Sequence, residues 1–391
     1  MTITLIAAAA LSPVQIVPVA PPPPPPPPVV LVSREPHGYG NGRPPEQRLL
    51  IWRTTGVLCR GDQSEEPSAP VFVRAPDPQR TLTWATNEPR TVTLDFRIDE
   101  SGRPLSIARS VPDYVSGSED IAPALAASRF APGQAHAGCK VTFSASSMPV
   151  AEAPLADVIA YAIFPTAPPI AAIRERIRPV ASTCVYPAPD VLLRAFPAFD
   201  SLPDQPGYRS WSVVGYDLDA KGKPRNLKTV AGSGAPALDR ASREAVARSR
   251  FASGVRTGCR YPYHKNAAIL AAPTAPEEDA MRPVDSTCPR DHVWSRPPAL
   301  NYPMSYSRRR IEGWAMIAYD VAPWGQTGNV RVLRSEPTAE FGEAASGMIR
   351  GAVFRDGGKG FVGCIDRVLY VMRKPGMTPA PGEEPASLAP F

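Results

Sequence analysis

A Phe followed closely by a Gly-Cys pair and then by a strand-like segment occurs three times in this sequence of 391 residues. The three copies are Phe130 with Gly138-Cys139, Phe251 with Gly258-Cys259, and Phe354 with Gly363-Cys364. A motif that recurs in the same order along a chain indicates repeated structural units. The sequence therefore predicts an array of small modules.

Further landmarks recur in the same order. The segment "RPVASTC" at residues 178–184 returns as "RPVDSTC" at residues 282–288, and "GVLC" ending at Cys59 is a degenerate first copy. An alternating segment then ends in a Gly turn, at Gly102, Gly222 and Gly325. From each turn Gly to the Phe that ends the following helix there are 28, 29 and 29 residues. The correspondence spans nearly the whole unit.

Local patterns predict the structure of one unit. The alternation from Trp211 to Leu218 is typical of a half-buried strand, and the Asp-x-x-Gly turn that follows is typical of a hairpin. Apolar residues from Phe341 to Ala352 recur at helical spacing, which predicts an amphipathic helix. The expected fold is α+β: three tandem small modules, each an antiparallel three-stranded sheet (hairpin, helix, strand) with the helix packed on one face.

The domain organisation follows from the repeats and from proline. The chain contains 50 Pro residues, more than twice the usual share of roughly 5%. Pro-rich stretches predict stiff connections between modules, located within residues 144–177 and 267–282. The expected segments are an N-terminal signal or anchor (1–20), a Pro-rich linker (21–48), a degenerate repeat (49–150), a second repeat (178–266), a third repeat (282–376) and a flexible tail (377–391).

The first twenty residues carry no charge. The apolar run Ile3–Leu11 has the length of a signal-peptide core, and Ala8 and Ala10 suit cleavage after it. A membrane-spanning helix needs about 20 apolar residues, and Pro13 and Pro18 interrupt this run. Export with cleavage is therefore favoured over an N-terminus anchored in the inner membrane, and the expected location is the periplasm.

Six cysteines fall two in each unit. Six thiols allow 15 pairings, and the repeat singles out the one in which every unit closes itself. The predicted pairs are Cys59 with Cys139, Cys184 with Cys259, and Cys288 with Cys364. Zinc ligation and thiol catalysis are alternatives, but both favour C-x-x-C spacing, which the chain lacks.

The sequence gives little support for nucleic-acid binding or for catalysis. The net charge of +6 is scattered, and the basic run Arg308-Arg309-Arg310 lacks interleaved aromatic residues, so nucleic-acid binding is not expected. The chain has four His, and the segment around Ser233 is not a G-x-S-x-G motif. Asp217 and Asp219 share one strand face beside a hairpin, where solvation is the better explanation. We expect no enzymatic activity, metal or cofactor.

Residues 298–374 resemble the C-terminal domain of TonB, the periplasmic energy transducer. The matching features are Tyr302-Pro303 ahead of a short helix, Glu312-Gly313 at the first strand, Gly325 at the hairpin, Phe341 at the start of the helix and Phe354 at its end. The first two units look like diverged copies that keep the hairpin and lose the Glu-Gly and Tyr-Pro pairs.

The resemblance implies a binding module that adds an extended peptide from the plug of an outer-membrane transporter to a sheet edge. The strand after Cys364 is the natural edge, with Val368, Tyr370 and Met372 on one side and Leu369 and Val371 on the other. The residues expected to bind the partner are Val368, Leu369, Tyr370, Val371, Tyr302 and Pro303. The alternative is an internal strand, or one protected from such pairing by Arg367 and Arg373.

The function that follows is a periplasmic TonB-like protein that supports energy-dependent transmembrane transport. Its partners would be an outer-membrane TonB-dependent receptor, or another periplasmic protein, and an inner-membrane motor complex. Two departures favour a periplasmic scaffold or adaptor without motor coupling as the second hypothesis. The chain has three units instead of one, and Pro21–Pro28 spans only about 25 Å as polyproline II.

Overall fold

The computed structural model describes residues 46–60, 68–84, 90–166, 171–185, 187–291, 293–355 and 358–372. All of them fall within a single unit that spans residues 45–391. The N-terminal segment 1–20, most of the Pro-rich linker and the tail 377–391 lie outside the described residues, as does Arg373. Within the described ranges, no helix combines the length and apolar character needed to cross a membrane.

Antiparallel sheets and short helices make up the described part of the chain. Two three-stranded sheets share one topology, in which the first strand of a hairpin lies in the middle and the last strand pairs on its other side. The second sheet consists of β10 (Ser210–Leu218), β11 (Pro224–Gly232) and β13 (Arg256–Lys265). The third consists of β15 (Gly313–Val321), β16 (Thr327–Glu336) and β18 (Phe361–Tyr370).

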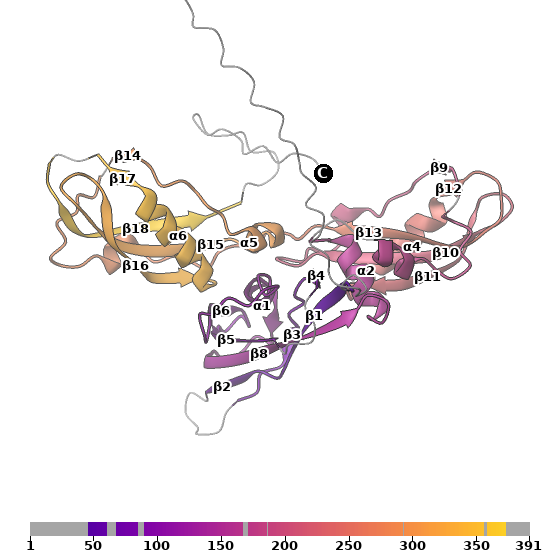
Figure 1. The fold of residues 1–391 in the computed structure, drawn as a ribbon, viewed down its shortest axis with the longest axis horizontal. Helices are drawn as coiled ribbons and strands as arrows, with labels where there is room; N and C mark the ends of the chain where they lie inside the picture. The colour runs from indigo at the N-terminus through magenta and orange to yellow at the C-terminus, as the bar shows by residue number, and fades with distance from the viewer. Residues whose placement is uncertain are drawn as a thin grey trace, which may run out of the picture. The chain divides into compact units, whose positions relative to one another are not determined.

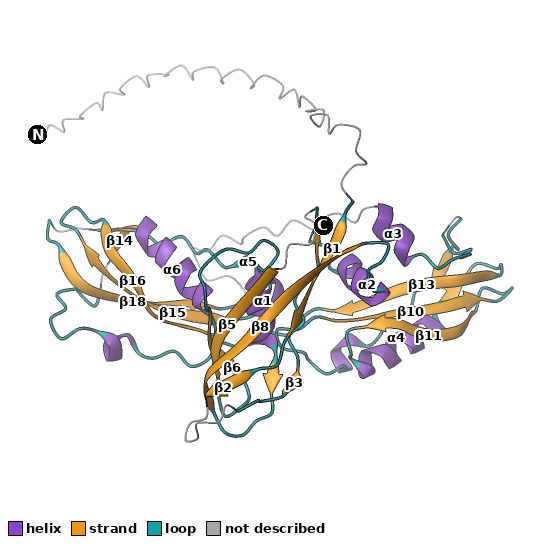
Figure 2. Cartoon of the chain, turned by 60° about the horizontal axis from the view of Figure 1, so that its bottom comes forward, coloured by secondary structure: helices purple, strands orange, loops and turns teal. Residues whose placement is uncertain are grey.

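A helix follows each hairpin and packs on one face of its sheet (Figures 1 and 2). These helices are α4 (Pro236–Arg248) and α6 (Ala339–Gly351). The apolar stripe of α6 is buried at Phe341, Ala345 and Ile349, as its periodicity predicts. The hairpin, helix and final strand therefore follow one another as expected in both sheets.

The middle strands are buried on both faces, whereas their alternation predicted strands that are half buried. Trp211 and Val213 of β10 pack against Ile159 and Ala160 of α2 (Leu155–Ile163). In the third sheet, Trp314 packs on the corresponding face with residues of the preceding connection, including Ala272, Ala275 and Met281. The connections between units thus serve as the second cover of each sheet. This explains why apolar residues occupy both faces of these strands.

The first sheet is larger than predicted. It has six strands, β1 (Arg48–Thr54), β2 (Leu58–Arg60), β4 (Thr81–Thr83), β5 (Arg90–Ile98), β6 (Pro104–Arg109) and β8 (His136–Pro149). The expectation of three strands is wrong here because β8 continues through residues 144–149 and pairs with β1 and β2 as well as β5. Its helix, α1 (Ile121–Ala127), is short and buried throughout.

The Phe that was expected to end each helix lies instead in a short strand after it. Phe130, Phe251 and Phe354 belong to β7 (Arg129–Phe130), β12 (Arg250–Phe251) and β17 (Val353–Phe354). Each N–H donates to the carbonyl of the turn Gly, at 2.8–3.1 Å. The short partner strands are β3 (Phe72–Arg74), β9 (Val191–Leu193) and β14 (Trp294–Arg296).

The structure contains the three predicted disulfides, Cys59–Cys139, Cys184–Cys259 and Cys288–Cys364. In each sheet, the second Cys pairs across the ladder with an aromatic residue of the middle strand: Phe96, Tyr216 or Tyr319. The Gly before each of these Cys has a positive φ of 57–69°, a conformation that favours Gly. The repeated Gly-Cys therefore marks a turn conformation and a covalent link at one register position.

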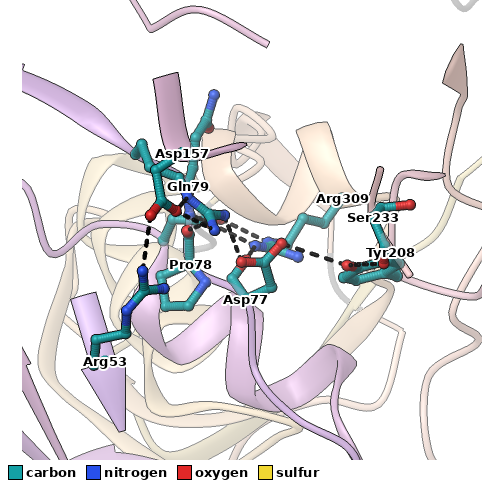
Figure 3. A network of polar contacts seen from close by, with 10 residues as sticks. Arg53, Asp77, Pro78, Gln79, Asp157, Tyr208, Ser233 and Arg309 are labelled. Atoms are coloured by element: carbon teal, nitrogen blue, oxygen red, sulfur yellow. Dashed lines mark hydrogen bonds and ion pairs between the residues drawn. The ribbon is translucent and has the colours of Figure 1, made fainter. Parts of the chain in front are cut away.

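Short elements complete the connections. These are α3 (Ala171–Ile177), α5 (Met304–Arg309) and the 3₁₀ turns η1 (Phe199–Ser201) and η2 (Glu278–Met281). Arg309 of α5 donates to both carboxylate oxygens of Asp120, at 2.7 and 2.5 Å, and to the carbonyl of Asp77 at 2.8 Å. Close by, Asp157 of α2 accepts a hydrogen bond from Arg53 at 2.8 Å (Figure 3). Arg80 donates to Asp157 at 2.8 Å and to the carboxylate of Asp77, so charged side chains from distant parts of the sequence form one polar network.

Candidate functional site

The candidate site is the last strand of the third sheet, β18, with the short helix α5 that precedes the sheet. Gly313 opens β15 directly opposite Tyr370, the last residue of β18. A Cβ on Gly313 would lie 2.6 Å from the ring of Phe341 and 2.7 Å from the carbonyl oxygen of Glu336. Glycine at this position therefore allows α6 to approach the sheet closely.

Tyr302 and Pro303 lie before α5, as the resemblance implied. The carbonyl of Pro303 accepts hydrogen bonds from the N–H groups of Tyr306 and Ser307 in the first turn of the helix. The Tyr302 hydroxyl donates to the carbonyl of Ile311 at 2.6 Å. These contacts fold the segment 302–311 back on itself at the start of β15. Both predicted residues therefore have a structural role in this segment.

Tyr302 and Tyr370 meet in an aromatic cluster under α6. Their ring centroids are 5.5 Å apart, and Phe341 lies 4.9 Å from Tyr370. Tyr370 is fully buried, and its hydroxyl donates to the carbonyl of Phe341 at 3.1 Å. Burial raises the pKa of both tyrosines, and Glu312 adds to the effect at Tyr302. Neither hydroxyl ionises near neutral pH, so the cluster is a neutral part of the core.

The side chains of β18 alternate as the sequence predicts. Val368 packs against the core and Tyr370 is buried in it, whereas Leu369 is 47% and Val371 63% exposed. Of the four predicted residues at the end of this strand and directly after it, only Leu369 and Val371 present substantial side-chain area to a partner.

The backbone on the outer side of β18 is partly occupied by residues 276–288, which we call the strap. The N–H of Arg367 donates to the Glu278 carboxylate at 3.1 Å, and Val362 exchanges hydrogen bonds with Thr287 at 3.1 and 3.0 Å. The Arg367 side chain also reaches Glu277 and the carbonyl of Pro276. From Val362 to Arg367, the outer edge is therefore covered by the chain itself.

Beyond Arg367 the outer edge has no backbone partner among the described residues. Residues of an antiparallel strand alternate in the side to which their N–H and C=O point. Because the Arg367 N–H points to the strap, the backbone groups of Leu369 and Val371 point outward as well. The open edge is thus short and includes the two exposed apolar side chains.

Three other strands, β16, β13 and β8, are less suited to strand addition. The β16 edge has two register irregularities against β15 and exposed Arg331 and Arg334, and bulges and charges of this kind oppose edge pairing. In β13, Pro262 stands three residues after Cys259, where Arg367 stands after Cys364. Proline lacks the N–H that points outward at this position. The strand β8 is interior to its sheet.

An open strand edge on a small α+β domain is the feature that one recurring mode of peptide recognition uses. Residues 298–361 match the family model of the Gram-negative bacterial TonB protein C-terminal domain. The chain thus carries a TonB C-terminal domain that extends from before α5 to the first residue of β18. Most of β18 follows the matched range. No curated protein matches the chain.

Sequence reasoning missed the strap. The signal was present, because Ser-Thr directly precedes both Cys184 and Cys288. Ser182 donates to the carbonyl of Gly258 at 3.0 Å and Ser286 to that of Gly363 at 2.9 Å. The repeated Ser-Thr therefore indicates an edge contact next to the disulfide. Among the described residues, no group of three or more His, Cys, Asp or Glu could hold a metal ion.

Proposed function

We propose that the third sheet binds an extended segment of a partner protein by strand addition to the outer edge of β18, starting at Leu369 and Val371. The observation that carries this proposal is the pair of exposed apolar side chains on a stretch of edge whose backbone groups point outward. Backbone hydrogen bonds would supply affinity, and the alternate side chains would fix the register. The role is binding, without catalysis.

The family match supports a periplasmic setting and a TonB-like role in energy-dependent transport. The partner is then the N-terminal plug segment of an outer-membrane receptor, with an inner-membrane motor complex as the energy source. We also propose that the three sheets are diverged tandem copies of one module. This proposal is supported by the shared register at Phe96, Tyr216 and Tyr319 and by the three matching disulfides.

The test uses the full chain and a labelled peptide from a receptor plug. Replacing Val371 with Pro should weaken binding about tenfold, because Pro removes one outward backbone donor. The matched change Val371→Ala should have a much smaller effect, since it removes only side-chain contact. Because this N–H does not bond β15, circular dichroism should be the same for both variants. Absence of peptide binding by the folded wild-type chain would refute strand addition.

A periplasmic scaffold without motor coupling is the second candidate. It is favoured by the strap, whose contacts with Val362 and Arg367 already use part of the edge. Membrane fractionation with N-terminal sequencing of the mature protein separates the two candidates. A transducer requires an N-terminus retained in the inner membrane, whereas a scaffold is released after cleavage.

A further inference from the structure

The second sheet contains a pocket of about 520 Å³, a volume within the range of ligand-binding sites. Among the described residues that line it, the aromatic ones are Tyr216, Phe251 and Tyr261, and Val191 of β9 lines it as well. We call it the second-sheet pocket. It lies on a module that has no role in the proposed function of the third sheet.

The three sheets differ at one position that explains this pocket. In each sheet, the repeated Phe that follows the helix has a residue of the short partner strand directly opposite it. The pairs are Phe72 opposite Phe130, Val191 opposite Phe251, and Trp294 opposite Phe354. Phe72 stacks on Phe130 at 4.3 Å, and Trp294 packs at 5.3 Å from Phe354. Only the second sheet has a small aliphatic residue at this position. Among the described residues of the second sheet, no aromatic ring of the partner strand packs on Phe251, and the guanidinium of Arg194 lies 5.4 Å from its ring centre instead.

The charged residues that line the pocket indicate the charge of its ligand. Four arginines line it, Arg174, Arg178, Arg194 and Arg260, together with one carboxylate, Glu175. The guanidinium of Arg194 lies 3.9 Å from the ring centre of Tyr261 and 5.4 Å from that of Phe251. Glu175 pairs with Arg178 at 2.9 Å, and the guanidinium groups of Arg194 and Arg260 add positive charge to the described lining. An aromatic group next to a carboxylate is complementary to this lining.

The rim indicates that the ligand is part of a protein. Val191, Leu192 and Leu193 of β9 are 44%, 70% and 54% exposed, and nearby Phe196 is 55% exposed. Among the described strands, β9 pairs with β12 and with no other. A free aromatic acid would leave this apolar strip in water, whereas an extended peptide would cover it along β9. We infer that the second-sheet pocket binds an extended acidic peptide segment of a partner protein through an inserted aromatic side chain.

The test measures the binding of a fluorescein-labelled peptide, Thr-Glu-Val-Phe-Glu-Val-Thr, to the full chain by fluorescence anisotropy. The substitution Val191→Trp reproduces the third sheet and should fill the pocket. We expect it to weaken binding at least about tenfold while leaving the thermal unfolding curve unchanged or shifted upward. Val255→Trp adds the same ring at a residue that is 63% exposed and does not line the pocket, so it should bind as the wild type does.

A charge variant gives a second readout. Arg194→Gln should weaken binding and reduce its dependence on salt, whereas Arg240→Gln removes an exposed arginine of α4 that does not line the pocket and should change neither. Replacing Phe in the peptide with Ala, or both Glu with Gln, should weaken binding by a similar factor. The Val371→Pro variant of the third sheet should bind this peptide as the wild type does. A failure of the proposed site at β18 can therefore be distinguished from a failure of the second-sheet pocket.

Three results would overturn the inference. The first is no binding of the peptide to the wild-type chain up to about millimolar concentration. The second is equal binding by the wild type and the Val191→Trp variant. The third is binding of 3-phenylpropanoate as tight as that of the peptide, which would show that the pocket recognises a small acid and that β9 takes no part. If Val191→Trp fails to fold, the Arg194→Gln and peptide variants decide.

Discussion

Asp217 and Asp320 hold the Gly-Cys turns of the second and third sheets in the same way. Asp320 accepts a hydrogen bond from the Gly363 N–H at 2.9 Å and from the Asn329 side chain at 2.7 Å. Asp217 accepts from Gly258 and Asn226 at 2.8 Å each. The side-chain bond from the Asn, followed by the backbone bond from the Gly, lowers the pKa of each carboxyl. These carboxylates therefore link the hairpin to the disulfide-bearing strand.

Replacing Asp320 with Asn should lower the free energy of unfolding by about 1 kcal/mol at neutral pH. In the variant, the amide oxygen at position 320 can accept the hydrogen bond of the Gly363 N–H. The amide NH₂ group at position 320 then faces the NH₂ group of Asn329, and two donors cannot form a hydrogen bond with each other. The lowered pKa means that the stabilisation is present above the ordinary carboxyl pKa and is lost as pH falls through the folded-state pKa. The difference between wild type and variant should therefore shrink below about pH 4.

Urea unfolding at several pH values measures this difference. Asp113→Asn is the matched control, because Asp113 is exposed and makes no hydrogen bond or ion pair that the structure shows. It should unfold as the wild type does throughout. A constant difference between Asp320→Asn and wild type down to about pH 2 would contradict the role assigned to the carboxylate.

At the scale of elements, the disulfides of the second and third sheets each join a connecting segment to the last strand, whereas Cys59 of the first lies on β2. In the third sheet, the Cys288–Cys364 bridge closes a loop with a sequence separation of 76. It lies next to the strap contacts of Ser286 and Thr287 with the beginning of β18. The bridge therefore stabilises the sheet and also holds the strap on the outer edge.

Replacing both Cys288 and Cys364 with Ala should reduce the free energy of unfolding by up to about 4.5 kcal/mol in the chain-entropy model. The backbone N–H groups of Val362 and Arg367 should also exchange with solvent faster, because the strap loses its covalent tether. Hydrogen exchange followed by mass spectrometry measures both effects. Non-reducing peptide mapping of wild-type protein should show the three within-unit pairs, and a bridge between units would contradict them.

At the scale of the molecule, buried polar groups connect residues that are far apart in the sequence. Arg309 and Asp120 have side chains only 11% and 15% exposed, and the N–H of Gln79 also donates to Asp120 at 2.6 Å. Burial alone would lower the pKa of Arg309, but the carboxylate of Asp120 outweighs it and raises this pKa. Glu336, at the end of β16, is buried as well and accepts a hydrogen bond from Arg97 at 2.9 Å.

Replacing Asp120 with Asn should cost about 3–5 kcal/mol of stability, because it leaves a buried guanidinium without its carboxylate. The matched control is the surface pair Arg225–Asp219, whose side chains are 56% and 28% exposed. Asp219→Asn also alters turn hydrogen bonds, so the control variant is Arg225→Gln, for which we expect less than about 1 kcal/mol. Differential scanning calorimetry measures both. Equal effects of the two variants would show that the buried pair adds little to stability.

The fold of the second and third units could be predicted well from the sequence. The alternation from Trp211 to Leu218, the turn at Gly222 and the helical stripe from Phe341 onward are local patterns, and local patterns determine strands, turns and helices directly. The position of Phe354 was not predictable in this way. Its short strand depends on β14, which is nearly sixty residues earlier in the sequence.

The candidate site was predictable only in part. The sequence indicated β18 and the alternation of Leu369 and Val371 with Tyr370, because strand periodicity fixes which side chains share a face. It could not show that the strap covers Arg367, since that contact joins residues 89 positions apart. Nor could it show that β8 is long enough to pair on both sides, because pairing partners of a strand are chosen by packing of distant segments.

By itself, the sequence determined the repeated order of hairpin, helix and strand and the pairing of its six cysteines. These features rest on spacing along the chain, which a repeat displays without any knowledge of space. Only the tertiary structure decided which edge of which sheet is open, and that Val191 lines a pocket at the position where Phe72 and Trp294 place aromatic rings in the other two sheets. Openness depends on which distant residues come to lie against a surface, and that is a property of the packed molecule.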